Sequence, residues 1–200
     1  MLKYMSVKRI WDIFISVFLI VLFVFPVLIF MAVIRLTSKG EAIFKQTRVG
    51  RGGREFVCYK LRTMYEDAPK SVATSQLWGA ERYVTPIGRF LRRTSIDELP
   101  QLINVLKGDM SIVGPRPLIP EETALHRERK KRGIYALRPG ITGLAQIRGR
   151  DMLSDSEKLD ADEEYKENIS LSFDLKIILS TVRCVTSGRG FSDGQEKSRQ

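Results

Sequence analysis

The sequence predicts an α+β protein that joins an N-terminal membrane-embedded helix to a small, helix-rich soluble domain with one β-hairpin and interfacial amphipathic helices. Three observations predict this class. An uncharged apolar run extends from Ile13 to Ile34. Two strand-like segments surround a glycine-rich turn within residues 42–61. In the rest of the chain, apolar residues recur mostly at helical spacing, and the sequence contains no internal repeat.

The composition limits the classes of function. The 200-residue chain carries a formal net charge of +10, which indicates an anionic partner such as phospholipid, nucleic acid or a phosphorylated substrate. His126 is the only histidine, so neither a catalytic triad nor a histidine-ligated zinc site is expected. Cys58 and Cys184 lie far apart in no metal-like spacing, which argues against a disulfide framework. Any metal is expected to be a hard cation such as Mg²⁺, held by carboxylates.

The apolar run is long enough to cross a membrane. At about 1.5 Å per residue, one helix over Ile13–Ile34 would match a hydrocarbon core of about 30 Å. Pro26 lies inside the run and predicts a kink or break, because proline removes a backbone donor. Basic residues flank both ends, as expected if both ends are cytoplasmic: Lys3, Lys8 and Arg9 before the run, and Arg35, Lys39 and Lys45 after it. The residues alone leave a kinked spanning helix and a re-entrant hairpin open.

Asp12 marks the edge of this run. A lone carboxylate in lipid is energetically costly. We therefore expect Asp12 either to pair with Lys8 or Arg9 at the level of the lipid headgroups, or to lie in water outside the membrane.

The following segment predicts a hairpin and then a helix. AIFKQ and EFVCYKL are strand-like, and VGRGG between them supplies turn glycines, all within residues 42–61. Residues 64–78 are predicted to form an irregular loop. A helix is expected to begin at Thr85 with Pro86 in its first turn. Its apolar side suits either a membrane interface or the protein core, and consists of Ile87, Phe90 and Leu91.

The C-terminal half contains segments of opposite charge. The basic stretch 125–140 is expected to lie against anionic headgroups or to form a solvated loop. Residues 155–167 are acidic and predict a helix. Residues 169–185 predict a last amphipathic helix, with Leu175, Ile178, Leu179 and Val182 on one side. Residues 187–200 are polar and predict a disordered tail.

The adjacent acids Asp97 and Glu98 precede a helical pattern, which consists of Leu99, Leu102, Ile103 and Leu106. Gly108 is a suitable end for this helix. Pro100 must lie in the first turn, so the helix is expected to begin near Asp97. Ser95 and Glu98 also have the spacing of a capping box. In one interpretation the two acids only cap the helix and contribute roughly 0.3–1 kcal/mol.

In the other interpretation the acids do chemistry at an anion site. A helix N-terminus attracts anions, and Arg92 and Arg93 lie one turn before it. Asp97 would attack phosphorus and form an aspartyl-phosphate type intermediate. Glu98 would hold Mg²⁺, which neutralises phosphate charge. Further candidates for holding the phosphate are Lys60, Arg62 and Arg116.

Two glycine- and proline-rich loops carry additional arginines, whose bidentate geometry suits phosphate oxygens. SIVGPRP contains Arg116, and RPGITGLAQIRGR contains Arg138, Arg148 and Arg150. For either loop alone, an ordinary turn with solvated arginines is the alternative. Both loops in one chain, together with an acidic pair and a membrane segment, favour a phosphate site.

At this point the sequence resembles the monotopic phosphoglycosyl transferases, also called bacterial sugar transferases. The resemblance runs from about Lys8 to Val185 and rests on several blocks in the same order and spacing: KRIWD, FKQTRVG, YKLRTM, RRTSIDELPQLINVLKGDMSIVGPRP, RPGITGLAQIRGR and YKENISLSFDLKIIL. The chain resembles the minimal catalytic form of the family, without extra spanning helices.

The resemblance implies transfer of a sugar phosphate from a UDP-sugar to undecaprenyl phosphate or a similar polyprenol phosphate, with UMP as the second product. It implies a covalent phospho-sugar on Asp97 and Mg²⁺ on Glu98. The first helix would be re-entrant and broken at Pro26, although short members carry Ser-Pro where this chain has Phe25-Pro26. Candidates for binding phosphate or substrate are Lys60, Arg92, Arg116, Arg138, Gln146 and Arg150. Asp162 and Tyr165 match a family pattern to which no role is assigned.

The expected organisation is a re-entrant membrane helix over residues 1–36, a catalytic domain over 37–186 and a polar tail over 187–200. The enzyme would lie on the cytoplasmic face of the bacterial inner membrane, in contact with its phospholipid, and would begin the assembly of a glycan. The sequence does not determine which sugar is transferred, which glycan is built or whether the chain forms a homodimer. The alternative is a membrane-anchored module or scaffold that binds anionic lipid without catalysis. Nucleic acid is not expected as a partner, because no nucleic-acid-binding motif is present.

Overall fold

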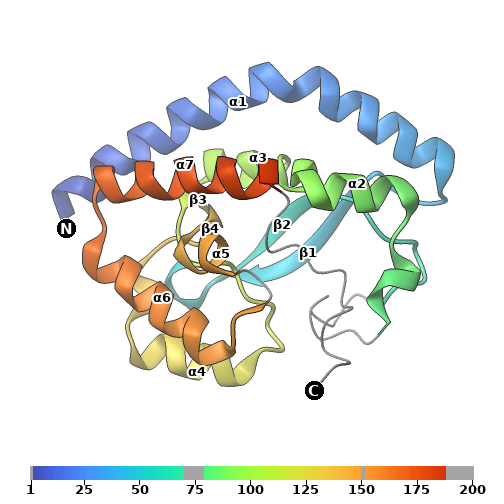
Figure 1. Ribbon diagram of the computed structural model, residues 1–200. Helices are drawn as coiled ribbons and strands as arrows, with labels where there is room; N and C mark the ends of the chain where they lie inside the picture. Colours follow the sequence, from blue (N-terminus) through green and yellow to red (C-terminus); the bar gives the residue numbers. More distant parts are fainter. Residues whose placement is uncertain (1, 70–78, 150–151, 188–200) are drawn as a thin grey trace.

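The computed structural model describes residues 2–69, 79–149 and 152–187, and it is a mixed α+β structure in which one long helix arches over a soluble domain (Figure 1). The helices are α1 (Leu2–Thr37), α2 (Pro86–Thr94), α3 (Gln101–Lys107), α4 (Thr123–Lys131), α5 (Leu144–Arg148), α6 (Asp155–Asn168) and α7 (Leu171–Ser187). The strands are β1 (Ile43–Val49), β2 (Glu55–Leu61), β3 (Ser111–Val113) and β4 (Gly140–Thr142). Short 3₁₀ turns are η1 (Arg51–Gly53), η3 (Ala80–Tyr83), η4 (Ile96–Glu98) and η5 (Ile134–Ala136).

The predicted hairpin is confirmed. β1 pairs antiparallel with β2, with Ile43 opposite Leu61. Between the strands, Gly52 and Gly53 have φ angles of 71° and 74°, a left-handed conformation that glycine adopts without strain. A second sheet pairs β3 with β4 in parallel. Each of these strands has only three residues, too few for alternation to reveal them in the sequence.

α1 runs as one helix through Pro26. Figure 1 shows it changing direction near the middle of its length, so α1 is bent and is not interrupted at Pro26. The most apolar 18-residue window of the helix has a mean hydropathy of 3.3, and the helix is the one candidate membrane span among the described residues. Apolar side chains along its middle are exposed, including Val21, Phe25 and Ile29.

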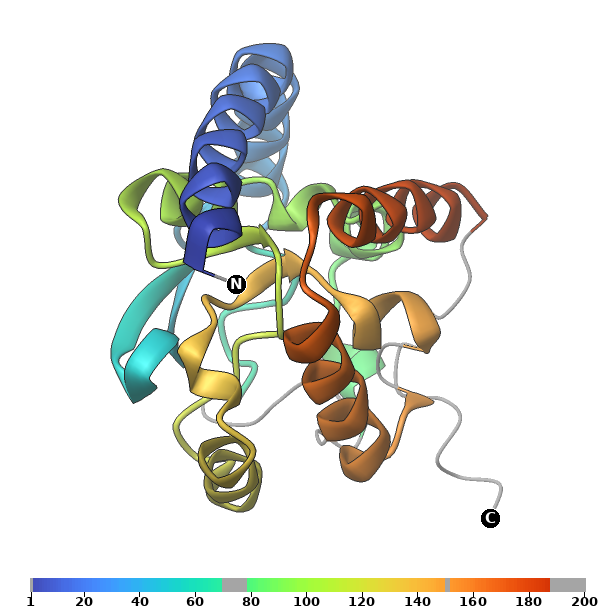
Figure 2. The ribbon, with the colours of Figure 1, turned by 90° about the vertical axis from the view of Figure 1, so that its left-hand side faces the viewer.

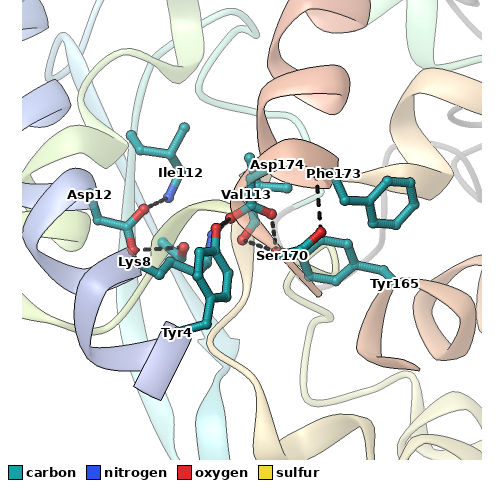
Figure 3. A network of polar contacts seen from close by, with 10 residues as sticks. Tyr4, Lys8, Asp12, Ile112, Val113, Tyr165, Ser170, Phe173 and Asp174 are labelled. Atoms are coloured by element: carbon teal, nitrogen blue, oxygen red, sulfur yellow. Dashed lines mark hydrogen bonds and ion pairs between the residues drawn. The ribbon is translucent and has the colours of Figure 1, made fainter. Parts of the chain in front are cut away.

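The N-terminal part of α1 is bound to the soluble domain. Asp12 accepts hydrogen bonds from Ser111 Oγ at 2.8 Å and from Ile112 N at 3.0 Å (Figure 3). The expectation that Asp12 pairs with a neighbouring cation or lies in water is wrong, because the carboxylate is buried against β3. Lys8 instead forms an ion pair with Asp174 of α7, at 2.5 Å.

Asp174 is the centre of a buried polar network that joins α1 to α6 and α7 (Figure 3). Its carboxylate also accepts hydrogen bonds from the hydroxyls of Tyr4 and Tyr165, both at 2.6 Å. Tyr165, which the family pattern left without a role, therefore helps to hold the membrane helix on the domain.

Two arginines attach α1 through backbone carbonyls. Arg9 donates from Nη1 to Val105 O of α3 at 2.6 Å. At the other end of α1, Arg62 donates from Nη2 to Ile34 O at 3.4 Å and to Ser38 O at 2.8 Å. Arg62 lines the cavity described below, but the terminal nitrogens of its guanidinium donate to carbonyls at the end of α1. Both ends of α1 are thus bound to one domain.

Three apolar clusters form the core of the described structure, and two of them contact α1. The main one includes Leu102, Val105, Met110, Val113, Tyr165 and Ile177. The second joins the C-terminal part of α1 to the hairpin and α2 through Ile34, Ala42, Leu61 and Leu91. A ring contact between Phe30 and Phe90, with centroids 5.9 Å apart, adds to the second cluster. α2 begins at Pro86 after the Thr85 cap, as predicted, and its apolar side packs on α1.

Apolar side chains are exposed on the helices beside α1. Figure 1 shows α2, α3 and α7 in a row beneath α1. On α7, Leu175, Leu179 and Val182 are exposed, Leu179 to 62%. On α3, Ile103 is 47% exposed, because the helix directs its other side, with Leu102, into the core. This arrangement is the one that interfacial helices require.

α4 and α6 lie at the end of the domain farthest from α1 (Figures 1 and 2). The basic stretch 125–140 begins in α4, so its first part is a helix and not the expected loop. Arg127, Lys130 and Lys131 are exposed, as expected for a solvated stretch, whereas Arg129 is buried in an ion pair with Asp162 of α6, at 2.6 Å. The tail beyond residue 187 lies outside the described residues, as do residues 70–78 of the expected loop.

Candidate active site

A cavity of about 780 Å³ lies against the hairpin and extends between α1, α4, α6 and α7. Its walls include both members of the acidic pair, Asp97 and Glu98. One part of the wall is apolar and comes from α1 and α7: Leu19, Ile178 and Val182. Another part is cationic: Arg48, Lys60, Arg92, Arg116 and Arg129. The cavity therefore connects an apolar side near the membrane helix with a positively charged interior.

A tight turn places the acidic pair in this cavity. After α2, Ser95 takes the left-handed conformation with a φ of 55°. η4 follows, and α3 begins only after Pro100. The expected helix start near Asp97 is therefore wrong, since both acids belong to a separate 3₁₀ turn. In the described structure Ser95 makes no side-chain capping bond, so the capping box with Glu98 is wrong as well.

Asp97 is a buried carboxylate, 8% exposed, with a raised pKa. Loss of hydration is the main cause, and the neighbouring Glu98 adds to it. Three cations, Lys60, Arg92 and Arg116, act in the opposite direction, and the pKa of Asp97 is raised to about 6. At neutral pH the carboxylate is therefore mostly ionised and poorly hydrated, as a nucleophile requires.

Glu98 holds two cations beside Asp97. Its Oε1 atom lies 2.8 Å from Lys60 Nζ and 3.5 Å from Arg116 Nη1. Lys60 comes from β2, and Arg116 comes from the loop after β3. The structure thus brings together residues from three separate parts of the sequence that were predicted to share one site.

Arg92 and Gln146, two further candidates, also line the cavity. Arg92 Nε donates to Thr63 Oγ1 at 2.8 Å, which orients its guanidinium. The Gln146 amide is buried, and neither its oxygen nor its nitrogen has a partner within the described residues. A buried amide without partners is costly, so a substrate that satisfied it would be bound preferentially.

The structure does not bring Arg138 to the cavity. Arg138 donates from Nε to Gly108 O at 2.9 Å and so caps the end of α3. Burial lowers the pKa of its guanidinium. Arg148 forms a two-pronged pair with Glu164, with both distances at 2.7 Å. Arg150 lies outside the described residues.

Sequence reasoning missed Arg48, which is half-buried, and Arg129, which is buried; both lie in the cavity wall. For Arg48 there was a signal: side chains alternate along a strand, so Arg48 and Gln46 share one side of β1. Two polar residues on a side that faces the protein interior indicate a polar cavity. For Arg129 no sequence signal separates it from its basic neighbours in α4.

Asp97 and Glu98, two carboxylates of the cavity, fit only one mode of magnesium coordination. Among the described residues, no group of three or more His, Cys, Asp or Glu side chains could hold a metal. Mg²⁺ often takes one or two protein carboxylates and completes its shell with substrate phosphates and water. Asp97 and Glu98, in a cavity with room for a diphosphate, fit that mode.

Known proteins are similar to this chain over nearly its whole length. A family model described as bacterial sugar transferase matches residues 3–188. The uncharacterized sugar transferase EpsL of Bacillus subtilis is 42% identical over 186 residues, 93% of this chain and 90% of that protein.

Two similar proteins, from Caulobacter vibrioides and Escherichia coli, are named UDP-glucose:undecaprenyl-phosphate glucose-1-phosphate transferase and are 45% and 44% identical to this chain. Each match covers 88% of this chain, but 68% of the first protein and 39% of the second. The family match spans every residue of the cavity wall. The chain belongs to the bacterial sugar transferase family.

Proposed function

We propose that this chain is a phosphoglycosyl transferase that moves a sugar phosphate from a UDP-sugar to undecaprenyl phosphate and releases UMP. The observation that carries the proposal is the buried Asp97 carboxylate in a cavity that also holds Lys60, Glu98 and Arg116. The names of the Caulobacter and Escherichia relatives support the same reaction. The product would be the first lipid-linked sugar of a polysaccharide, in line with a 35% identical exopolysaccharide production protein, ExoY, of Rhizobium meliloti.

The reaction would proceed in two transfers. A carboxylate oxygen of Asp97 attacks the sugar-bearing phosphorus, the bond from that phosphorus to the bridging oxygen breaks, and UMP leaves with that oxygen. A phosphate oxygen of the acceptor then attacks the same phosphorus and releases Asp97, which forms the polyprenyl-diphosphate sugar. Lys60 and Arg116 lie where they neutralise the charge that develops on the phosphate oxygens.

Mg²⁺ is the proposed cofactor, and Glu98 is its proposed protein ligand. When bound, the ion would neutralise charge on the diphosphate. Glu98 has a second role in either case: it keeps Lys60 and Arg116 close to Asp97.

The proposal includes a re-entrant membrane helix. Lys8 and Asp12 bind one end of α1 to the domain, and Arg62 binds the other. A helix that crossed the bilayer would place its ends on opposite faces, about 30 Å apart, where one domain could not bind both. Basic residues at both ends support the cytoplasmic face of the bacterial inner membrane. The exposed apolar side chains of α3 and α7 would contact its phospholipid.

The apolar wall of the cavity supports a lipid acceptor. Leu19 comes from α1, and Ile178 and Val182 come from α7. An isoprenyl chain that lay against these side chains would leave its phosphate near the cationic interior. The acceptor would thus reach Asp97 from the membrane side of the cavity.

Release of UMP tests the proposed function. Protein in detergent or nanodiscs is mixed with Mg²⁺, undecaprenyl phosphate and a panel of UDP-sugars. Release beyond one UMP per protein molecule should require the lipid, all release should require the metal, and Asp97→Asn should lower turnover at least about 10³-fold. Asp160→Asn is the control, because Asp160 is an exposed carboxylate of α6 and does not line the cavity.

Equal release from the wild-type and Asp97→Asn proteins would contradict the covalent mechanism. No release from any sugar, by folded protein, would favour the alternative of a lipid-binding module or scaffold.

A further inference from the structure

The loop that carries Arg116 is held through four consecutive backbone carbonyls. Each accepts a hydrogen bond from a different donor: Pro115 O from Gly140 N (2.9 Å), Arg116 O from Arg129 Nη1 (2.8 Å), Pro117 O from Arg48 Nη1 (3.0 Å) and Leu118 O from Val49 N (2.9 Å). Two of these donors are backbone amides at strand ends. The other two are side chains of arginines, Arg129 buried and Arg48 half-buried, so the loop depends on charged groups that the chain must at least partly desolvate.

Asp162 orients the Arg129 guanidinium, which also contacts the loop. Its Nη2 atom donates to Asp162 Oδ2 at 2.6 Å, and its Nη1 atom donates to the Arg116 carbonyl. Both members of the ion pair are buried. The planar guanidinium has a rigid fork of donors, so a carboxylate bound on one side determines where the other side points.

Arg48 supports the next carbonyl in the same manner. Its Nη2 atom donates to Gln46 Oε1 at 2.6 Å, and its Nη1 atom donates to Pro117 O at 3.0 Å. Gln46 and Arg48 lie on the same side of β1, so the strand alternation that brings Arg48 to the cavity also brings its partner.

Both arginines line the cavity, and a direct role as phosphate ligands is the rival interpretation. However, both terminal nitrogens of each guanidinium donate to protein oxygens. Asp162 also neutralises the charge of Arg129. By contrast, the Arg116 side chain is exposed and lies beside Glu98. The geometry therefore favours an action through Arg116 over direct contact with substrate.

We propose that Arg129, fixed by Asp162, and Arg48 are positioning residues that determine where the Arg116 guanidinium lies relative to Glu98 and Asp97. The inference rests on the proposed transfer reaction, in which Arg116 neutralises phosphate charge. It also assigns a role to Asp162, a residue of the family pattern, although Asp162 touches neither Asp97 nor Glu98 within the described structure. Displacement of a binding group by about 1 Å lowers rates on the order of 10²-fold.

The variant Arg129→Lys tests the positioning role. Lysine keeps a positive charge beside Asp162 but lacks the fork that reaches both Asp162 and the Arg116 carbonyl. We expect kcat/KM for UMP release to fall about 10- to 100-fold. Arg132→Lys is the matched control: Arg132 also links α4 to α6, through Asp160 at 2.6 Å, and its described bonds do not include the loop.

A double-mutant cycle separates positioning from general damage to the fold. The second change is Arg116→Lys, which keeps a cation in the cavity and therefore leaves turnover to measure. Once Arg116 has lost its guanidinium, Arg129→Lys should lower kcat/KM less than about threefold further. The change in melting temperature caused by Arg129→Lys should be the same in both backgrounds. An equal fold-loss of kcat/KM in both backgrounds would overturn the proposal.

Hydrogen exchange of a peptide over residues 114–120 gives a readout that does not need turnover. Exchange should be faster in Arg129→Lys than in the wild type, and unchanged in Arg132→Lys. If the wild type releases no UMP, the transfer reaction fails while this measurement still tests the support of the loop. Unchanged exchange in Arg129→Lys would reject that support.

A second variant is available if Arg129→Lys folds poorly. Arg129→Met combined with Asp162→Leu removes both buried charges together, so no unpaired charge remains. This double variant should keep a melting temperature near that of the wild type and still show the 10- to 100-fold loss of kcat/KM, because the carbonyl bond is absent. Wild-type activity in the folded double variant would overturn the proposal.

Discussion

Asp97 is ionised at a position that favours its neutral form. Its pKa is raised from the ordinary 3.8 to about 6, because burial removes the hydration of the charge. The folded chain therefore binds a proton more readily than the unfolded chain between these two pH values. Stability contributed by the protonated form is present below about pH 4 and is lost as the pH rises through 6.

Asp97→Asn should for this reason stabilise the fold. At pH 7.5 we expect the free energy of unfolding to rise by roughly 1–3 kcal/mol, because a neutral amide of the same shape needs less hydration. The gain should diminish between pH 6 and pH 4. Unfolding in detergent without Mg²⁺, at several pH values, measures it, with Asp160→Asn as the control. An Asp97→Asn protein that is less stable than the wild type at pH 7.5 would contradict the raised pKa.

For individual residues, the sequence predicted which side chains gather at the cavity, but not which partner each arginine binds. The structure brings Lys60, Glu98 and Arg116 together as expected. Arg62 and Arg138 were assigned to phosphate but bind backbone carbonyls. A guanidinium satisfies either kind of oxygen, and only the tertiary structure decides which one lies within reach.

Among the elements, α1 ends in an unusual way. Arg62, which follows β2, donates to Ile34 O in the last turn of α1 and to Ser38 O just beyond it. The Arg62 guanidinium lies so close to Gly40 that a side chain on that glycine would collide with it. Gly40 also has a φ of 103°, which other residues rarely adopt. The hairpin and the membrane helix are therefore coupled through one buried cation.

Arg62→Lys should weaken this junction. Lysine cannot donate to Ile34 O and Ser38 O at once with the same geometry, and a hydrogen bond to a charged group contributes about 1.5–3 kcal/mol. We expect the free energy of unfolding to fall by about that amount, and exchange of the amides at 34–40 to become faster. Arg54→Lys, at an exposed position near the hairpin turn, should change neither. Unchanged exchange at 34–40 in Arg62→Lys would show that the cap does not hold the end of α1.

Elements with strong local chemistry could be predicted, and those made by tertiary contacts could not. The hairpin has its glycines, α2 has Thr85 and Pro86, and both were expected. The turn at Ser95 could not be predicted, because serine rarely takes a positive φ and does so here between two packed helices. The helical pattern that contains Leu102 and Ile103 does not reveal that the first is buried and the second exposed, because apolar residues on either side of the helix look the same in sequence.

For the molecule as a whole, the network around Asp174 determines where the membrane helix lies. Tyr4 and Lys8 come from α1, while Asp174 and Tyr165 come from the last two helices. The two ends of the described chain are thus joined by buried charges and hydroxyls (Figure 3). The network stabilises the fold when every buried polar group in it has a hydrogen-bond partner. Removal of one member leaves the others without partners and destabilises the fold.

Lys8→Met should destabilise the whole protein by about 3–5 kcal/mol, because it leaves the Asp174 carboxylate buried without its cation. Adding Asp174→Asn should restore part of the loss, since the remaining group is neutral. Thermal unfolding of the wild type, both single variants and the double variant gives the coupling energy. Additive losses would mean that the two side chains do not act as a pair. Lys158→Met, which removes a cation from an ion pair on α6, is the control.

The attachment of both ends of α1 to one domain has a consequence for topology. In the re-entrant arrangement proposed above, α1 returns the chain to the side of the bilayer from which it started. A reporter fused before Leu2 would therefore share an aqueous compartment with Asp97, and a protease or impermeant label that reached one would reach the other. Only the arch between the two attachments would be shielded, at a depth limited by the length of helix on either side of its bend.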